Sequence, residues 1–360
     1  MKRIDEEFER LRDGRDLTPF EESAVYAVAR LIIELEQASQ QVLAEGVIID
    51  DGRGGFPVEH PALMVEKRCS SEIRGWVKDR PDLFGGAMVA PAQAEKPDWL
   101  IGRQVPRLEV VPDGDATIAD KAVEFCRAVG MTLYPWQEHF LRDMLLTGED
   151  GTWASREVVS SVPRQNGKGE ILVARELVGV YLLDEQRIMH SAHFLDTAID
   201  AGERLFDLIS MNPDLMGWWA DQFSGEPKLI KSNGKDAIHF PNGAKIYFRT
   251  RTKKTGRGLS FDLVVFDECF DLPNEVYAAM NNTTKARPNA QKIFISSPVN
   301  RYEHSHGAVF SAKRWAAMDD APGVMLKEWS PEEGADPFSR EAWEQANPSL
   351  VEGGGHFVRS

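Results

Sequence analysis

A polar loop between an apolar run and a helix-forming segment carries the clearest chemical signature. The sequence "VVSSVPRQNGKGEILVAREL" places Gly167 and Lys168 directly before a long apolar segment. A strand, a loop and a helix in this order point backbone amides at an anion, while the lysine reaches the β- and γ-phosphates of a nucleotide. The pattern G-x-x-x-x-G-K-[ST] is met only in part, because Val162 replaces its first glycine and Gly169 its hydroxyl residue. Taken alone, the segment fits an ordinary loop as well as a phosphate site.

Two adjacent acids follow a second apolar run, in "FDLVVFDE". A buried strand that ends in Asp267 and Glu268 predicts that the first acid holds the Mg²⁺ shell and the second orients the attacking water. Two solvated acids that open a loop are the alternative, which the apolar run and the upstream loop disfavour. Because Gly169 lacks the hydroxyl that normally binds Mg²⁺, either Asp267 and water alone hold the metal or hydrolysis is compromised.

The segment "TLYPWQEHFLRDML" precedes the phosphate-loop strand and offers groups for a base. The amide of Gln137 has two donors and an acceptor, enough to read both edges of an adenine, and Tyr134 or Trp136 could stack beside it. The alternative is an ordinary helix start with Pro135 in its first turn.

Short polar side chains follow a further apolar run, "KIFISSPVN". Hydroxyls at Ser296 and Ser297, with Asn300 close behind, could sense a γ-phosphate at the end of a core strand. They are equally common at the start of a turn.

A local basic segment, "AKIYFRTRTKKTGRGLS", stands out in an acidic chain. A solvated loop is one interpretation. The functional one assigns an arginine finger to Arg257 and DNA phosphate contacts to Lys253 and Lys254. The cations of the segment are Lys245, Arg249, Arg251, Lys253, Lys254 and Arg257.

Strand-like runs that alternate with helices position these groups. The runs "REVVSSVP", "RIMHSAH", "AKIYFRT", "LVVFDE" and "KIFISSP" predict an α/β domain with a mainly parallel sheet. The N-terminal region differs: Thr18, Pro19 and Glu21 form a capping box, and apolar residues at helical spacing predict a helix that ends near Gly46.

The region between this helix and the sheet is less regular. It contains a strand-like pair at 48–49, a Gly-rich turn and an amphipathic helix expected over 62–78. The Pro-, Gly- and Ala-rich stretch 85–116 is interpreted as a linker, with a domain boundary near residue 95.

Composition limits the classes of function. The net charge of −15 argues against a broad DNA-binding face, so any DNA contact must be local. The three cysteines are isolated and predict neither disulfides nor a zinc site. Charges interrupt every apolar run and the N-terminus has no apolar signal core, so neither a membrane span nor secretion is expected.

The motifs "YPWQ", "PRQNGKG", "LVVFDE", "SSP" and "WEQANPSL" occur in the order seen in large terminase subunits of tailed double-stranded DNA phages, which this chain resembles over about residues 100–350. The resemblance implies an additional-strand, RecA-like P-loop NTPase fold with ATP and Mg²⁺ as cofactors. It implies an ATP-binding set of Gln137, Arg164, Gln165, Asn166, Gly167, Lys168 and Gly169.

The resemblance also assigns roles. Arg164 would contact the γ-phosphate, Glu268 would be the catalytic carboxylate, and Ser296, Ser297 and Pro298 would form a coupling motif. Arg257 would act on a neighbour's ATP, with Arg251 as the reserve choice.

A ring of subunits would drive double-stranded DNA through a portal protein into a procapsid in the host cytoplasm. A small terminase subunit or a nuclease would be its partner.

Three regions result: an N-terminal extension over 1–95, the ATPase domain over 96–350, and a tail over 351–360. The extension, in "GVIIDDGRGGFPVEHPAL", weakly resembles the end of a phage small terminase subunit. Relatives continue into a nuclease domain, for which the sequence leaves no room before Ser360, so nuclease activity is not expected from this chain. Two alternatives stay open: a helicase-like ATPase, and a catalytically weak nucleotide-binding adaptor for packaging partners.

Overall fold

The computed structural model describes residues 2–12, 14–15, 17–45, 48–49, 58–59, 61–62, 64–65, 68–69, 72–73, 76, 80, 83, 96–232, 236–252, 255, 258–300 and 302–352. The chain divides into two compact units, residues 1–93 and 94–360. Among the described residues, no helix is both long enough and apolar enough to span a membrane.

The first unit is built on two helices, α1 (Lys2–Arg12) and α2 (Pro19–Glu45). The predicted capping box is confirmed, because the Thr18 amide donates to Glu21 Oε2 (2.9 Å) and the Glu21 amide donates to Thr18 Oγ1 (3.4 Å). The apolar faces of the helices pack together around Val28, which is fully buried.

The rest of the first unit is described only in part. Strands β1 (Ile48–Ile49) and β2 (Val58–Glu59) pair antiparallel. The described positions between 62 and 76 are helical, as expected, whereas the Gly-rich turn between the strands lies outside the described residues.

One nine-stranded sheet forms the centre of the second unit, in the order β3-β11-β4-β10-β9-β5-β8-β7-β6. Its six middle strands, from β11 to β8, run parallel, and β3, β7 and β6 add antiparallel at the edges. The strands are β3 (Leu108–Val110), β4 (Glu157–Ser161), β5 (Arg187–Ala192), β6 (Lys228–Ile230), β7 (Ala237–His239), β8 (Lys245–Thr250), β9 (Leu263–Phe266), β10 (Gln291–Ser296) and β11 (Val324–Glu328).

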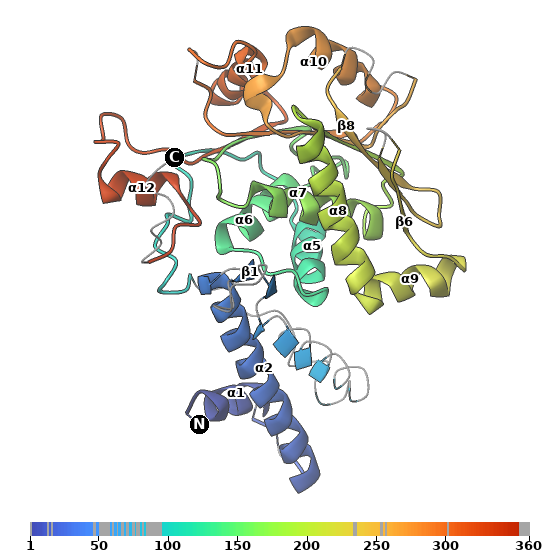
Figure 1. Cartoon of the computed structure of the whole chain (residues 1–360), viewed down its shortest axis with the longest axis vertical. Coiled ribbons are helices and arrows are strands. Elements are labelled where there is room, and N and C mark those ends of the chain that lie inside the picture. Colours follow the sequence, from blue (N-terminus) through green and yellow to red (C-terminus); the bar gives the residue numbers. More distant parts are fainter. Residues whose placement is uncertain are drawn as a thin grey trace. The chain divides into compact units, whose positions relative to one another are not determined.

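Helices cover both faces of this sheet, with α5 to α9 on one face and α10 and α11 on the other (Figure 1). The helices are α5 (Thr117–Ala128), α6 (Pro135–Met144), α7 (Lys168–Tyr181), α8 (Leu195–Met211), α9 (Pro213–Phe223), α10 (Asn274–Asn281), α11 (Ala308–Met318) and α12 (Arg340–Ala346), with the 3-10 turns η1 (Cys269–Asp271) and η2 (Asn282–Thr284).

Alternation along the strands divides the core between the two faces. In β9, Leu263 and Val265 pack with the α5–α9 layer, whereas Val264 and Phe266 pack with α10 and α11. Because both faces are covered, β9 is apolar throughout, which is why it is visible in the sequence as a short apolar run.

The five strands expected from the sequence are confirmed, and so is the mainly parallel sheet. The linker interpretation of 85–116 is wrong for its second half. There β3 pairs with β11, and Leu100 forms a bridge with Val351. The prolines and glycines of this half therefore belong to an edge strand and the segments that flank it, not to a linker.

Candidate active site

The phosphate-loop sequence folds as expected between β4 and α7. Two left-handed residues, Gln165 (φ 62°) and Gly167 (φ 76°), turn the chain into the helix, which begins at Lys168. Glycine is required at 167, because a Cβ there would lie 2.8 Å from Nε2 of Gln137. That nitrogen instead donates to the Gly167 carbonyl (2.9 Å).

The two acids stand where β9 ends. The Asp267 amide donates to the Ser191 carbonyl of β5 (2.9 Å), and the Glu268 amide donates to Asp267 Oδ1 (2.7 Å). Glu268 has left-handed backbone angles (φ 52°, ψ 49°), which a non-glycine residue adopts at a cost. Its Oε2 is buried and has no hydrogen-bond partner among the described residues. The Glu268 side chain lines the cavity, which is where a general base has to stand to reach a bound water.

Arg251, just after β8, fixes this strained turn. Its Nη1 donates to the carbonyls of Glu268 (3.1 Å) and Asp271 (2.6 Å). These bonds within its own chain disfavour the reserve assignment of Arg251 as a finger for a neighbouring subunit, which stays a prediction.

Strand β10 joins the phosphate loop to the acidic turn. The Val162 amide donates to the Ser296 carbonyl (2.9 Å), and Ser296 Oγ accepts from the Phe270 amide (2.8 Å). Ser296 is fully buried and is thus a connecting residue, whereas Ser297 faces the cavity and Pro298 is exposed.

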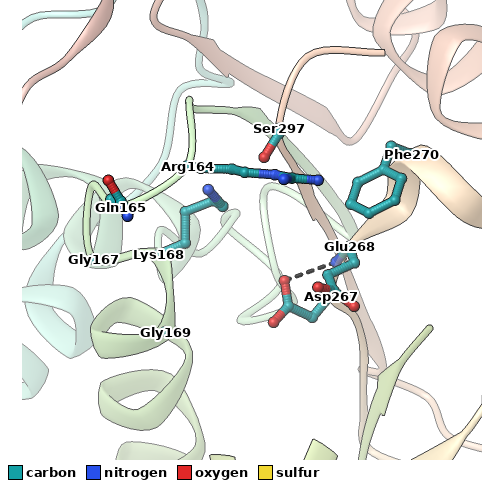
Figure 2. A pocket seen from close by; sticks show the side chains of 9 residues that line it. All are labelled: Arg164, Gln165, Gly167, Lys168, Gly169, Asp267, Glu268, Phe270 and Ser297. Atoms are coloured by element: carbon teal, nitrogen blue, oxygen red, sulfur yellow. Dashed lines mark hydrogen bonds between the residues drawn. The ribbon is translucent and has the colours of Figure 1, made fainter. Parts of the chain in front are cut away.

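These loops enclose a cavity of about 300 Å³ at the carboxyl edge of the parallel strands. Figure 2 shows Arg164 and Lys168 on one side of it, with Asp267 and Glu268 opposite. Its lining residues are Arg164, Gln165, Gly167, Lys168, Gly169, Asp267, Glu268, Phe270 and Ser297. Cations that face carboxylates across an open space suit a polyphosphate with a divalent cation.

The two cations differ in their surroundings. Lys168 Nζ donates to the carbonyls of Val162 (3.0 Å) and Pro163 (2.8 Å). Burial lowers the pKa of Lys168 to about 8, an effect that nearby Asp267 opposes. Arg164 is exposed and its guanidinium lies 5.9 Å from the centre of the Phe270 ring.

The cavity wall fits Mg²⁺ only in part. Asp267 offers carboxylate oxygens, which Mg²⁺ prefers, but Gly169 offers none. A side chain at 169 would have room, because a Cβ there would lie 3.7 Å from its nearest neighbour, Nη1 of Arg204.

Some residues predicted to contact the nucleotide are buried behind the phosphate loop and do not line the cavity. The Gln137 amide oxygen accepts from the Tyr134 amide (2.7 Å), so its carboxamide positions the loop, and contact with adenine stays a prediction. Asn166 is fully buried. Trp136 is also fully buried against Trp329, with ring centres 4.9 Å apart, and so cannot stack on a base.

Two neighbours of the site were not anticipated. Phe270 lines the cavity, and Arg204 of α8 approaches Gly169, but no local pattern marks either residue. Lys253, Lys254 and Arg257 lie outside the described residues.

Comparison with known proteins gives one family match. Residues 160–309 match the N-terminal part of the T4-like-virus type of large terminase subunit. No curated protein sequence matches the chain significantly.

Among solved structures, the large terminase of bacteriophage HK97 is similar over 67% of this chain and 49% of its own, with 19% identity and a TM-score of 0.53. The likeness shows a shared α/β fold, and this chain spans about half the length of that protein.

Two further structures have a TM-score of only 0.38 and add nothing to the fold assignment. The Thermus phage P74-26 large terminase ATPase domain is 18% identical and covers 50% of this chain and 71% of its own. The ADP complex of a large terminase from the thermophilic bacteriophage D6E is 11% identical and covers 66% and 47%.

Proposed function

Because residues 160–309 carry the sequence pattern of large terminase subunits, we propose that residues 96–350 form an ATPase domain that moves double-stranded DNA into a procapsid. The cavity carries this proposal: Arg164 and Lys168 face Asp267 and Glu268 at the carboxyl edge of a parallel sheet. Nucleotides bind at this edge in open α/β folds.

Strand order supports a P-loop NTPase of the additional-strand type. Strand β10 lies between β4, which leads into the phosphate loop, and β9, which ends in the acids. Both motifs can therefore reach one ligand while β10 holds them at a fixed spacing.

The phosphate loop binds the nucleotide in this proposal. The left-handed turn at Gln165 and Gly167 and the start of α7 direct amides toward the phosphates. Lys168 then exchanges its contacts with loop carbonyls for contacts with phosphate oxygens, and Arg164 places its exposed guanidinium on the γ-phosphate.

Hydrolysis depends on the acidic turn. Asp267 would hold Mg²⁺, which when bound neutralises phosphate charge. Glu268 orients and polarises the attacking water through its carboxylate, and Arg251 holds the backbone of the turn that carries it. Ser297 contacts the γ-phosphate. Ser296 transmits the loss of that phosphate to the acidic turn through its hydrogen bond with the Phe270 amide.

The wider roles follow the terminase proposal. Lys253 and Lys254 contact DNA phosphates, and Arg257 reaches the ATP of a neighbouring subunit in a ring. The partners are the portal protein of a procapsid and a small terminase subunit or nuclease, in the host cytoplasm.

The direct test is Glu268→Ala. We expect ATP turnover to fall by about a hundredfold or more while ATP binding is retained, because the carboxylate acts on water rather than on the nucleotide. Glu226→Ala, at an exposed position between α9 and β6, is the matched control. Undiminished hydrolysis by Glu268→Ala would remove Glu268 from this role.

The proposed role of Arg257 is tested in mixed assemblies. Arg257→Ala subunits combined with Glu268→Ala subunits should recover part of the turnover. At some interfaces, Arg257 of a Glu268→Ala subunit then meets an ATP site with an intact Glu268. An absence of recovery in verified mixed rings would count against action between subunits.

The second candidate is a nucleotide-binding adaptor with little turnover. Gly169 favours it, because the residue that normally supplies a hydroxyl to Mg²⁺ is missing. ATP binding without turnover in the presence of Mg²⁺, DNA and procapsid would establish the adaptor.

A further inference from the structure

One residue of the phosphate loop makes its contacts away from the cavity. Asn166 is fully buried, and its Nδ2 donates to the carbonyls of Pro163 (3.3 Å) and Arg164 (3.2 Å). It also donates to Oδ1 of Asn347 (2.9 Å), far along the chain. The side chain therefore holds the loop in shape and connects it to the segment after α12.

Ser349 completes this connection. Its amide donates to Asn166 Oδ1 (3.1 Å), and its hydroxyl donates to the Asn166 carbonyl (2.9 Å). The same hydroxyl accepts from Nε1 of Trp136 (2.9 Å). Asn166 is thus bound through its carboxamide and its carbonyl by two residues of "WEQANPSL", a motif for which the proposed chemistry has no use.

The segment 347–350 is itself fixed from the other side. Asn347 Nδ2 donates to the Trp343 carbonyl of α12 (3.0 Å), and Gln104 Nε2 donates to the Pro348 carbonyl (2.7 Å). Gly102 packs so closely that a Cβ there would lie 2.1 Å from the Asn347 carbonyl oxygen. A rearrangement of the loop at Asn166 would therefore have to break contacts with this segment.

We propose that Asn347 and Ser349 are positioning residues of the nucleotide site, and that through Asn166 they couple nucleotide occupancy to the order of residues 347–352. The inference rests on the proposed function, since it needs a nucleotide in the cavity. If residues 347–352 stabilise the conformation of the phosphate loop that binds nucleotide, a bound nucleotide must stabilise residues 347–352 by the same free energy.

The coupling predicts two measurable effects. Saturating ADP should slow hydrogen exchange in a peptide that spans 345–352. Opening of the segment disturbs the loop at Asn166, so with ADP bound it also loses part of the free energy of ADP binding. The double variant Asn347→Ala with Ser349→Ala removes three side-chain hydrogen bonds to Asn166 and Trp136 and weakens ADP binding by about tenfold or more.

Ser339→Ala is the matched control. Ser339 caps α12 by accepting from the Ala342 amide (3.1 Å), and the loop is not among its contacts. Ser339→Ala destabilises the start of α12 without touching the loop, so its ADP affinity should stay close to that of the wild type.

The outcomes separate the two proposals. Failure of the wild type to bind ADP would refute the proposed function and this inference with it. If the wild type binds ADP but exchange at 345–352 does not change, the coupling alone is refuted, and this measurement needs no variant. Equal ADP affinity in the double variant and in Ser339→Ala would refute the positioning role.

Discussion

Position 169 is where the chemistry of the phosphate loop is least complete. In the general P-loop pattern a hydroxyl follows the lysine and binds Mg²⁺, and here that position is glycine with open space beside it. The missing oxygen leaves Asp267 as the cavity residue best suited to hold the metal. Under the proposed function, we therefore expect residue 169 to limit how tightly Mg²⁺ is held beside ATP.

The substitution Gly169→Ser should lower the Mg²⁺ concentration at which turnover is half-maximal and raise kcat severalfold. The new side chain meets only Nη1 of Arg204 at an ordinary contact distance, so the fold should tolerate it. The measurement is a Mg²⁺ titration of steady-state ATP hydrolysis.

Gly169→Ala is the control, because both substitutions favour the helix by up to about 1 kcal/mol and only serine adds an oxygen. If the two variants have the same Mg²⁺ dependence, the hydroxyl is irrelevant to this site.

At the scale of elements, β10 is the connection between the two halves of the site. It pairs with β4 and with β9, and Ser296 at its end bonds to the phosphate loop and to the acidic turn. The adjacent Ser297 has a different environment, since it lines the cavity. Of the two neighbouring serines, Ser296 connects the two loops, whereas Ser297 faces the cavity.

We expect Ser296→Ala to lower the free energy of unfolding by about 1 kcal/mol and to reduce kcat, because the half-buried Phe270 amide loses its acceptor. Ser297→Ala should leave stability unchanged and alter the dependence of turnover on ATP. Thermal unfolding and steady-state kinetics of both variants check this. The reverse pattern would contradict the assigned roles.

The sequence predicts the strands that carry a recognisable apolar run next to a functional residue. Strands β4, β5, β8, β9 and β10 each stand out as apolar runs, and the acids and lysine at their ends meet as expected. The order along the chain, strand then functional residue, is enough to place such residues at one edge of a parallel sheet.

Strand β11 is not among the strands expected from the sequence, and it ends in two charged residues. Lys327 and Glu328 are buried in this strand, where Lys327 pairs with Glu109 and Asp143 and Glu328 pairs with Arg314. Partners so distant in sequence cannot be identified from local pattern. The antiparallel strands β3, β6 and β7 are three residues each and leave little periodicity to detect.

The direction of loop side chains is also beyond prediction. Gln137 and Asn166 belong to the expected motifs, but their carboxamides bond to the protein rather than line the cavity. A left-handed residue on either side of Asn166 sets that direction, and the sequence does not reveal which way such a turn rotates its neighbours.

For the whole molecule, charge is the main constraint on the packaging role. A net charge of −15 disfavours broad contact with DNA, so we expect contact to be confined to a local basic segment such as 245–257. The nucleotide site requires no such contact, because its cations and acids all come from one unit. ATP chemistry can therefore be tested separately from DNA movement.

The most direct test of the account is steady-state ATP hydrolysis by the purified chain, with and without Mg²⁺ and double-stranded DNA, beside Lys168→Ala. We predict Mg²⁺-dependent turnover that is lost in Lys168→Ala, since that variant lacks the cation that binds the phosphates. ATP binding with no Mg²⁺-dependent turnover under any of these conditions, or turnover unchanged in Lys168→Ala, would contradict the assignment of this cavity as an ATPase site.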